Sequence, residues 1–228
     1  MNIPFFHVVF NKISDLTEDS VLNLPYNIGD IRKNVNILII DDNEFNAESH
    51  LTANGYQIEH KKDIDTIKDV EPYEIIMCDI SGVGKNLGYE KEGAFIIREI
   101  HANYPLKRII AYTSYTYNAE YNQFFSLADC VASKDLGIDD WISILDTQVK
   151  NAINPVKQWE KIRKYLLDNN VSTLSIAKIE DKYVQAIKKK DMKALTKFVS
   201  GERLNIKSII TEFSTSLCAK IILGAIGV

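Results

Sequence analysis

The chain has 228 residues, of which 46% are hydrophobic and 25% are charged, a composition that excludes a disordered or fibrous protein. This length suits one domain of ordinary size with an appendage, or two small domains. Residues 1–150 carry 13 Lys and Arg against 24 Asp and Glu, a net charge of −11, whereas residues 151–228 carry 14 against 7, a net charge of +7. The asymmetry predicts two parts with different functions.

Two classes of protein are disfavoured by the distribution of apolar residues and cysteines. No run of about 20 apolar residues is present, so we expect no membrane span, and the N-terminus lacks the pattern of a signal peptide. The three cysteines show no paired spacing, and we expect Cys78 and Cys130 to be reduced thiols buried in strands. These features together favour a cytoplasmic location.

Residues 1–34 form an N-terminal arm whose packing the sequence does not define. The apolar run at residues 5–10 suits either a strand or a segment that packs on a neighbouring surface. Residues 35–153 then alternate strand and helix signals. Five β-rich apolar runs predict strands at residues 35–40, 56–60, 73–79, 107–113 and 130–133.

The segments between and after these strands carry helical patterns. We expect helices at residues 43–54, 63–70, 92–103, 118–127 and 139–153, with Gly55 ending the first of them. Strand–helix alternation at this rhythm implies right-handed crossovers. The pattern therefore predicts an α/β fold, a doubly wound five-stranded parallel sheet over residues 35–153.

Residues 154–228 are expected to form an all-helical extension of three or four amphipathic helices. Asp191 is a candidate cap for a short helix that runs through Val199, and the last helix is expected to extend from about Ile206 into residue 226. A module of this size suits signal output or dimerisation.

Chemically distinctive residues follow four of the five predicted strands. Asp41 and Asp42 follow the first strand, Asp79 ends the third, Thr113 ends the fourth, and Lys134 follows the fifth. In an open parallel sheet, ligands bind outside the carboxyl ends of the strands, so these side chains are expected to share one cleft. Three carboxylates, a hydroxyl and an ammonium indicate a site for a divalent cation and a phosphoryl group.

This arrangement resembles the receiver domain of bacterial two-component response regulators. Receivers carry an acidic pair after strand one, a phospho-accepting Asp after strand three, a Thr or Ser after strand four and a Lys after strand five. The resemblance implies a flavodoxin-like or receiver-like fold in which Asp79 accepts a phosphoryl group. Lys134 would pair with Asp79 and then with the phosphoryl group, to which the Thr113 hydroxyl would donate.

The resemblance also implies a Mg²⁺ site. Asp42 and Asp79 would ligate the ion directly, Asp41 directly or through water, and the backbone carbonyl of Ser81 would add a ligand. Mg²⁺ is a hard cation that relieves the repulsion between converging carboxylates while it keeps several waters.

Four departures from the receiver pattern point to an unusual readout. Val83 stands where receivers have Pro, Asp135 follows Lys134 in place of Pro, and Val131 replaces the usual aromatic switch residue. The glycine-rich loop at residues 81–89 is also longer than usual. No charged group is lost, so we expect the acceptor chemistry to survive and the readout to differ, with the long loop as a candidate element.

The function that follows is an atypical response regulator of a phosphorelay, a phosphoprotein and no enzyme beyond accepting its own phosphoryl group. Its expected partners are a sensor histidine kinase or a phosphotransfer protein, a protein that receives the output, and a second copy in a homodimer. Two alternatives stay open. One is a pseudo-receiver that binds partners without phosphotransfer. The other is a transcriptional regulator whose basic helices bind DNA, although no recognition-helix signature accompanies them.

Overall fold

The computed structural model describes residues 9–16, 27–88, 92–114 and 121–225. The chain divides into two compact units. One comprises Tyr26–Asn154 and is called the sheet unit below. The other comprises Met1–Pro25 with Pro155–Gly227 and is called the helical unit. Within the described ranges, no helix has both the length and the hydrophobicity that a membrane span requires.

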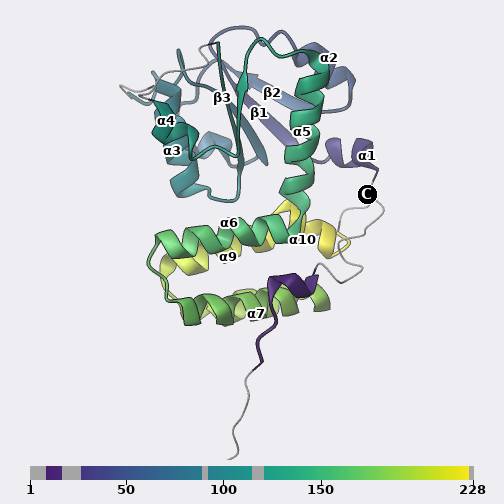
Figure 1. Cartoon of the computed structure of the whole chain (residues 1–228), viewed down its shortest axis with the longest axis vertical. Helices are drawn as coiled ribbons and strands as arrows, with labels where there is room; N and C mark the ends of the chain where they lie inside the picture. The colour runs from purple at the N-terminus through teal and green to yellow at the C-terminus, as the bar shows by residue number, and fades with distance from the viewer. Residues whose placement is uncertain (1–8, 17–26, 89–91, 115–120, 226–228) are drawn as a thin grey trace, which may run out of the picture. The chain divides into compact units, whose positions relative to one another are not determined.

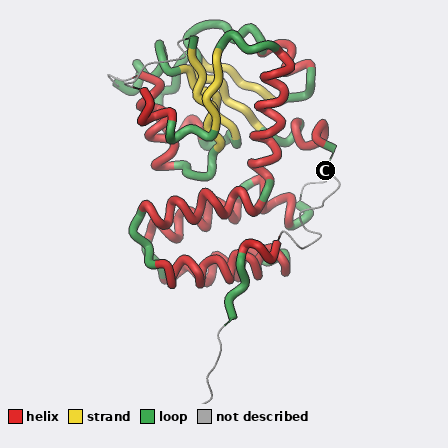
Figure 2. The backbone as a smooth tube through the Cα atoms, viewed as in Figure 1, coloured by secondary structure: helices red, strands yellow, loops and turns green. Residues whose placement is uncertain are grey.

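The sheet unit is built on five parallel strands in the order β2-β1-β3-β4-β5. Figure 1 labels β1, β2 and β3, and Figure 2 draws the strands in yellow. The predicted doubly wound sheet is confirmed, and this strand order is the flavodoxin-like one. The central strands are buried almost throughout because helices cover both faces. The strands are β1 (Asn36–Ile40), β2 (Gln57–Lys61), β3 (Ile75–Asp79), β4 (Arg108–Thr113) and β5 (Cys130–Ser133).

Helices cover the two faces of this sheet. Figure 1 shows α2 (Glu48–Ala53) and α5 (Ile138–Ile153) on one side, and α3 (Glu92–Asn103) and α4 (Asn122–Phe125) on the other. The predicted inward stripe of α5 is present, since Trp141, Leu145 and Val149 are buried. The opposite face packs Ile96, Ile97 and Ile100 of α3 against the strands. Burial of these apolar faces stabilises the layered fold.

Two predicted helices are shorter in the structure because their polar residues make other contacts. The helix expected at residues 43–54 begins at Glu48, since Asn43 donates hydrogen bonds to Asp41 and Asp42. The helix expected at 63–70 is only the 3₁₀ turn η3 (Ile67–Val70), closed by a capping box between Thr66 and Asp69. The helix expected at 118–127 is described as α4, and residues 118–120 lie outside the described residues.

One helix was not predicted: α1 (Ile28–Arg32), in the arm before the first strand. Arg32 makes a bidentate pair with Asp146 of α5, with N–O distances of 2.8 and 2.7 Å. The Tyr56 hydroxyl donates to the same carboxylate at 2.7 Å, and the Arg32 guanidinium lies 4.7 Å from the centre of the Tyr56 ring. This network joins α1 to α5 within the sheet unit.

The helical unit confirms the all-helical prediction for the C-terminal region. Asp191 caps α8 as expected, accepting the Ala194 amide at 3.1 Å. The last predicted helix is broken, because Ser216 ends α9 and its hydroxyl accepts the Ala219 amide at the start of α10. The helices are α6 (Pro155–Asp168), α7 (Thr173–Lys189), α8 (Met192–Phe198), α9 (Leu204–Thr215) and α10 (Leu217–Ile222), with the 3₁₀ turn η5 (Val199–Gly201) after α8.

The N-terminal segment at residues 9–16 belongs to the helical unit and packs on α7 (Figure 1). Its 3₁₀ turn η1 spans Ile13–Leu16. The Asp181 carboxylate accepts both the backbone and side-chain N–H groups of Asn11, at 2.9 and 2.6 Å, and Glu180 accepts the Ile13 amide at 2.8 Å. Of the apolar run at residues 5–10, residues 5–8 lie outside the described part.

Candidate functional site

Three aspartates meet at the carboxyl ends of β1 and β3. These strands are neighbours in the sheet, with Ile40 in register with Cys78, so the residues that follow them lie side by side. Asp41, Asp42 and Asp79 each present an oxygen within 4.8 Å of the others. Asp41 and Asp79 are buried, whereas Asp42 is partly exposed. The cluster offers hard oxygen ligands with one side open to water, a donor set that suits Mg²⁺.

Lys134 supplies the positive charge of this cluster. Its Nζ lies 2.6 Å from Asp79 Oδ2 and 2.9 Å from Asp41 Oδ2. Burial lowers the pKa of Lys134, but the hydrogen bonds with Asp41 and Asp79 outweigh this and leave the pKa raised. Burial raises the pKa of Asp79, and the bond from Lys134 opposes that rise. The lysine therefore stays charged and compensates two buried carboxylates.

Asp41 has its hydrogen-bonding capacity largely filled by the protein. Its carboxylate accepts the Asn43 amide at 3.0 Å and the Tyr112 hydroxyl at 2.9 Å, besides the Lys134 ammonium. Burial raises the pKa of Tyr112 and the adjacent carboxylate raises it further, so the phenol stays neutral and donates. The capacity left for a cation is concentrated on Asp42 and Asp79.

Thr113 and Ser81 flank the cluster. Thr113 is buried at the end of β4, where its carbonyl accepts the Lys134 amide at 3.1 Å. The Ser81 amide donates to Asp79 Oδ1 at 3.3 Å. The structure thus brings oxygens of the three carboxylates within 4.8 Å of one another and Lys134 into contact with Asp41 and Asp79. Thr113 and Ser81 lie beside them, while the roles of individual residues stay predictions.

The sequence did not reveal several residues that shape the site. Tyr112 is one, and His60 at the end of β2 is another: its ring nitrogens lie 2.9 Å from the Asp41 carbonyl oxygen and 2.8 Å from Glu48 Oε2. Gly93 is the third, because a Cβ there would lie 1.8 Å from the Asp79 carbonyl oxygen. His60 could have been predicted, because a polar residue at the end of a strand is a recognisable sequence signal. No comparable signal in the sequence marks Tyr112 or Gly93.

The long loop after β3 closes on the acidic cluster. Gly82 has φ +85°, and a Cβ there would lie 2.5 Å from both Asp42 carboxylate oxygens, so only glycine fits. Its amide donates to the Glu92 carboxylate. Val83, at the position where receivers have Pro, is fully buried in the core. The loop is described as far as Gly88, and Tyr89 lies outside the described residues.

The cysteine expectation needs one correction. Cys78 is buried in β3, and burial raises the pKa of its thiol. Cys130 is only half-buried, because β5 is an edge strand with a partly exposed burial pattern.

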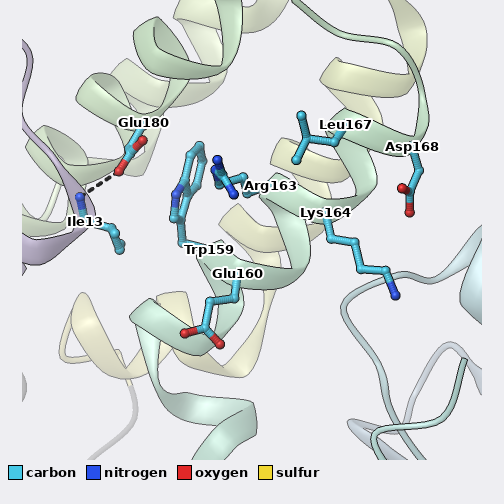
Figure 3. A pocket seen from close by; sticks show the side chains of 8 residues that line it. All are labelled: Ile13, Trp159, Glu160, Arg163, Lys164, Leu167, Asp168 and Glu180. Atoms are coloured by element: carbon cyan, nitrogen blue, oxygen red, sulfur yellow. Dashed lines mark hydrogen bonds between the residues drawn. The ribbon is translucent and has the colours of Figure 1, made fainter. Parts of the chain in front are cut away.

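The helical unit carries a separate pocket of about 510 Å³ (Figure 3). In Figure 3, Trp159 stands between Arg163 and the Ile13–Glu180 contact, in which the Ile13 amide donates to Glu180 at 2.8 Å. None of the acidic-cluster residues contributes to it. Its lining residues are Ile13, Trp159, Glu160, Arg163, Lys164, Leu167, Asp168 and Glu180.

Comparisons with known proteins give similarity in structure alone. No family model matches the sequence, and no curated protein sequence is similar to it. A response regulator from Thermotoga maritima has 13% identity and a TM-score of 0.42, over 50% of this chain and 97% of that one. A CheY-like response regulator receiver domain protein from Methanospirillum hungatei has 19% identity and a TM-score of 0.43, over 52% of this chain and 95% of that one.

A third similar structure is the Thermotoga maritima response regulator TrrA in complex with Mg(2+)-BeF. It has 19% identity and a TM-score of 0.40, over 50% of this chain and 98% of that one. Identities this low concern the fold and not the activity. The 2-1-3-4-5 strand order and the acidic cluster at the strand ends are properties of the chain itself. On these grounds the sheet unit has the receiver domain fold, with an all-helical region following it.

Proposed function

We propose that the sheet unit accepts a phosphoryl group on Asp79 with Mg²⁺ bound, and that the chain works as an atypical response regulator. The observation that carries this proposal is the position of Lys134 Nζ, 2.6 Å from Asp79 and 2.9 Å from Asp41, in a cluster that Asp42 completes. An ion pair with a purely structural role needs only one carboxylate beside the lysine, and this cluster has three. Three converging carboxylates are costly unless a cation binds them.

Each residue of the cluster would have a distinct role in the reaction. Asp42 and Asp79 would hold Mg²⁺, with Asp41 acting directly or through water and the Ser81 carbonyl as a further ligand. When bound, the ion neutralises the charge of the phosphoryl group during transfer. An Asp79 carboxylate oxygen attacks the phosphorus of an acyl phosphate or phosphohistidine. The donor's bond to phosphorus breaks, and its electron pair leaves with the donor.

Lys134 and Thr113 would stabilise the product. Lys134 already lies at hydrogen-bond distance from Asp79, so it can pair with a phosphoryl group attached there. Thr113 ends β4, which lies between the strands that lead to Asp79 and Lys134, and its hydroxyl would donate to the phosphoryl group. Thr113 is buried and Lys134 is partly buried, and this exclusion of water strengthens the contacts.

Intact-mass measurement tests the proposal. The full chain is incubated with Mg²⁺ and acetyl phosphate, and a gain of one phosphoryl group is expected in the wild type and not in Asp79→Ala. Asp30→Ala removes an exposed carboxylate of α1, in the same unit but outside the cluster, and is expected to keep the gain. An unchanged wild-type mass would favour the pseudo-receiver, in which the same fold binds partners without phosphotransfer.

The output is proposed to pass through the helical unit to a protein partner or a second copy of the chain. Val131, which replaces the aromatic switch residue of receivers, has no ring, so the usual inward aromatic movement is not available, and the residue is 50% exposed. Nucleic acid is the second candidate partner, favoured by the exposed lysines 189, 190, 193 and 197. Binding to duplex DNA that weakens steeply with salt would support it.

A further inference from the structure

The loop after β3 is pinned by one carboxylate that the receiver pattern does not include. Asp63 accepts the Gly84 amide on Oδ1 at 2.7 Å and the Asn86 amide on Oδ2 at 3.1 Å. The Asn86 side chain adds a bond to Asp65 at 2.9 Å. Two oxygens of one carboxylate thus fix the backbone on both sides of a single residue, Lys85.

This anchoring gives the Lys85 side chain a defined origin beside the acidic cluster. Its Nζ lies 3.8 Å from Asp42 Oδ2. The side chain is 64% exposed, so its pairing with Asp42 is screened by water and is weak. Asp42 is the one carboxylate of the cluster that solvent reaches, and Lys134 contacts only the other two.

We propose that Lys85 is a second lysine of the cation site, which pairs with Asp42 in the metal-free protein and lowers the affinity of the cluster for divalent cations. In the metal-free protein, Lys134 then pairs with Asp41 and Asp79, and Lys85 pairs with Asp42. A divalent cation that binds Asp42 must displace Lys85, because like charges repel at this distance. Lys85 is a positioning residue under this proposal, and Asp63 acts through it.

The inference rests on the Mg²⁺ site of the proposed function, but it does not need phosphotransfer. Mg²⁺ binding is measured by titration calorimetry on the full chain without a phosphodonor. An exposed ion pair changes affinity by about two- to fivefold, so Lys85→Met is expected to bind Mg²⁺ more tightly by about that factor. Lys85→Arg keeps the charge and is expected to restore the wild-type affinity.

A matched control separates local pairing from the general loss of positive charge. Lys33→Met removes an exposed lysine that pairs with Asp30 at 3.4 Å, just before the amino end of β1. A smaller change is expected there. Equal affinities for wild type and Lys85→Met, or equal effects of the two substitutions, would overturn the proposal. No saturable binding by the wild type would overturn the Mg²⁺ site of the proposed function as well.

A double-mutant cycle tests the part played by Asp63. Asp63→Ala changes the charge near the site by itself, so the informative quantity is the effect of Lys85→Met measured in the Asp63→Ala background. If Asp63 holds the loop, that effect is smaller than in the wild-type background. An undiminished effect would refute the role of Asp63, because Lys85 would then reach Asp42 without the anchored loop.

Discussion

The Tyr112 hydroxyl donates a hydrogen bond of 2.9 Å to Asp41 Oδ2, although 71 residues separate the two along the chain. Tyr112 is fully buried between the sheet and α5, and its ring meets those of Phe45 and Trp141 with centroids 5.6 and 5.9 Å away. This hydrogen bond fixes the carboxylate of Asp41, which also accepts a hydrogen bond from Lys134. Tyr112 therefore both packs against the aromatic rings of the core and fixes the position of Asp41.

Tyr112→Phe is expected to lower the free energy of unfolding by about 1–2 kcal/mol. The ring contacts persist, but a buried carboxylate loses a donor. Urea unfolding at neutral pH checks this. Tyr104→Phe removes a hydroxyl bonded to Glu71 at the surface and is expected to change stability by less than about 0.5 kcal/mol. Equal effects of the two substitutions would contradict the anchoring role of Tyr112.

Lys134→Met is expected to destabilise the chain by about 3 kcal/mol in a buffer that contains a metal chelator. It leaves Asp41 and Asp79, 1% and 4% exposed, without their shared positive charge. Added Mg²⁺ is expected to recover part of this loss, because the cation replaces the missing charge. Thermal unfolding with and without Mg²⁺ measures both effects. A loss that Mg²⁺ leaves unchanged would argue against cation binding at the cluster.

The stability contributed by Asp146 is expected to depend on pH. Burial alone would raise the pKa of Asp146, but the bonds from Arg32 and Tyr56 outweigh it and lower the pKa below its ordinary value of 3.8. A carboxyl whose pKa is lowered by folding stabilises the protein above the ordinary pKa, and this contribution disappears as the pH falls through the lowered value.

Asp146→Asn is therefore expected to cost about 2 kcal/mol at pH 7, and progressively less below pH about 4. Urea unfolding of the wild type and the variant across this range gives the difference directly. A difference that stays constant with pH would show that the charge of Asp146 does not contribute.

Gly93→Ala is expected to destabilise the protein by about 3 kcal/mol and to displace Asp79. The added Cβ would lie 1.8 Å from the Asp79 carbonyl oxygen, a backbone atom that cannot rotate away. Gly137→Ala is the control, since the nearest atom to a Cβ there would be a flexible Asp140 carboxylate oxygen at 3.7 Å. Thermal unfolding is the measurement, and a tolerated Gly93→Ala would mean that α3 and β3 are farther apart in solution.

Asp181→Ala is expected to loosen residues 9–16 from α7. This carboxylate accepts both N–H groups of Asn11 and the Gln185 amide. Amide hydrogen exchange of a peptide covering residues 9–16 is expected to accelerate, with little change in the α9 peptides. Asp168→Ala, an exposed carboxylate on α6, serves as control. Unchanged exchange would mean that the Glu180 bond to Ile13 and apolar contacts suffice to hold the segment.

Several elements could be predicted closely because their signals are local. The strands are short β-rich runs buried on both faces, and α3 has the predicted bounds, Glu92–Asn103. The alternation of elements implies a parallel sheet, whose geometry brings strand ends together. The meeting of Asp41, Asp42 and Asp79 thus followed from the order of elements before any distance was known.

Predictions failed where a polar side chain makes a short-range hydrogen bond that competes with the helix. Residues 43–47 have helical propensity, yet Asn43 bonds to the acidic pair and the helix begins at Glu48. The terminal apolar stripe runs past Ser216, but that hydroxyl caps a new helix. Periodicity records which residues face the core and contains no information about such competing hydrogen bonds.

The layered α/β fold, the helical C-terminal region and the residues at the strand ends follow from the sequence alone. The long-range hydrogen-bond partners follow from the tertiary structure: Asp41 with Tyr112, Asp63 with the loop around Lys85, and Arg32 with Asp146 across 114 residues. Local patterns depend on neighbours within a few positions, whereas these hydrogen bonds depend on which strands and helices lie side by side. The distances that determine the chemistry of the cluster are therefore set by tertiary packing.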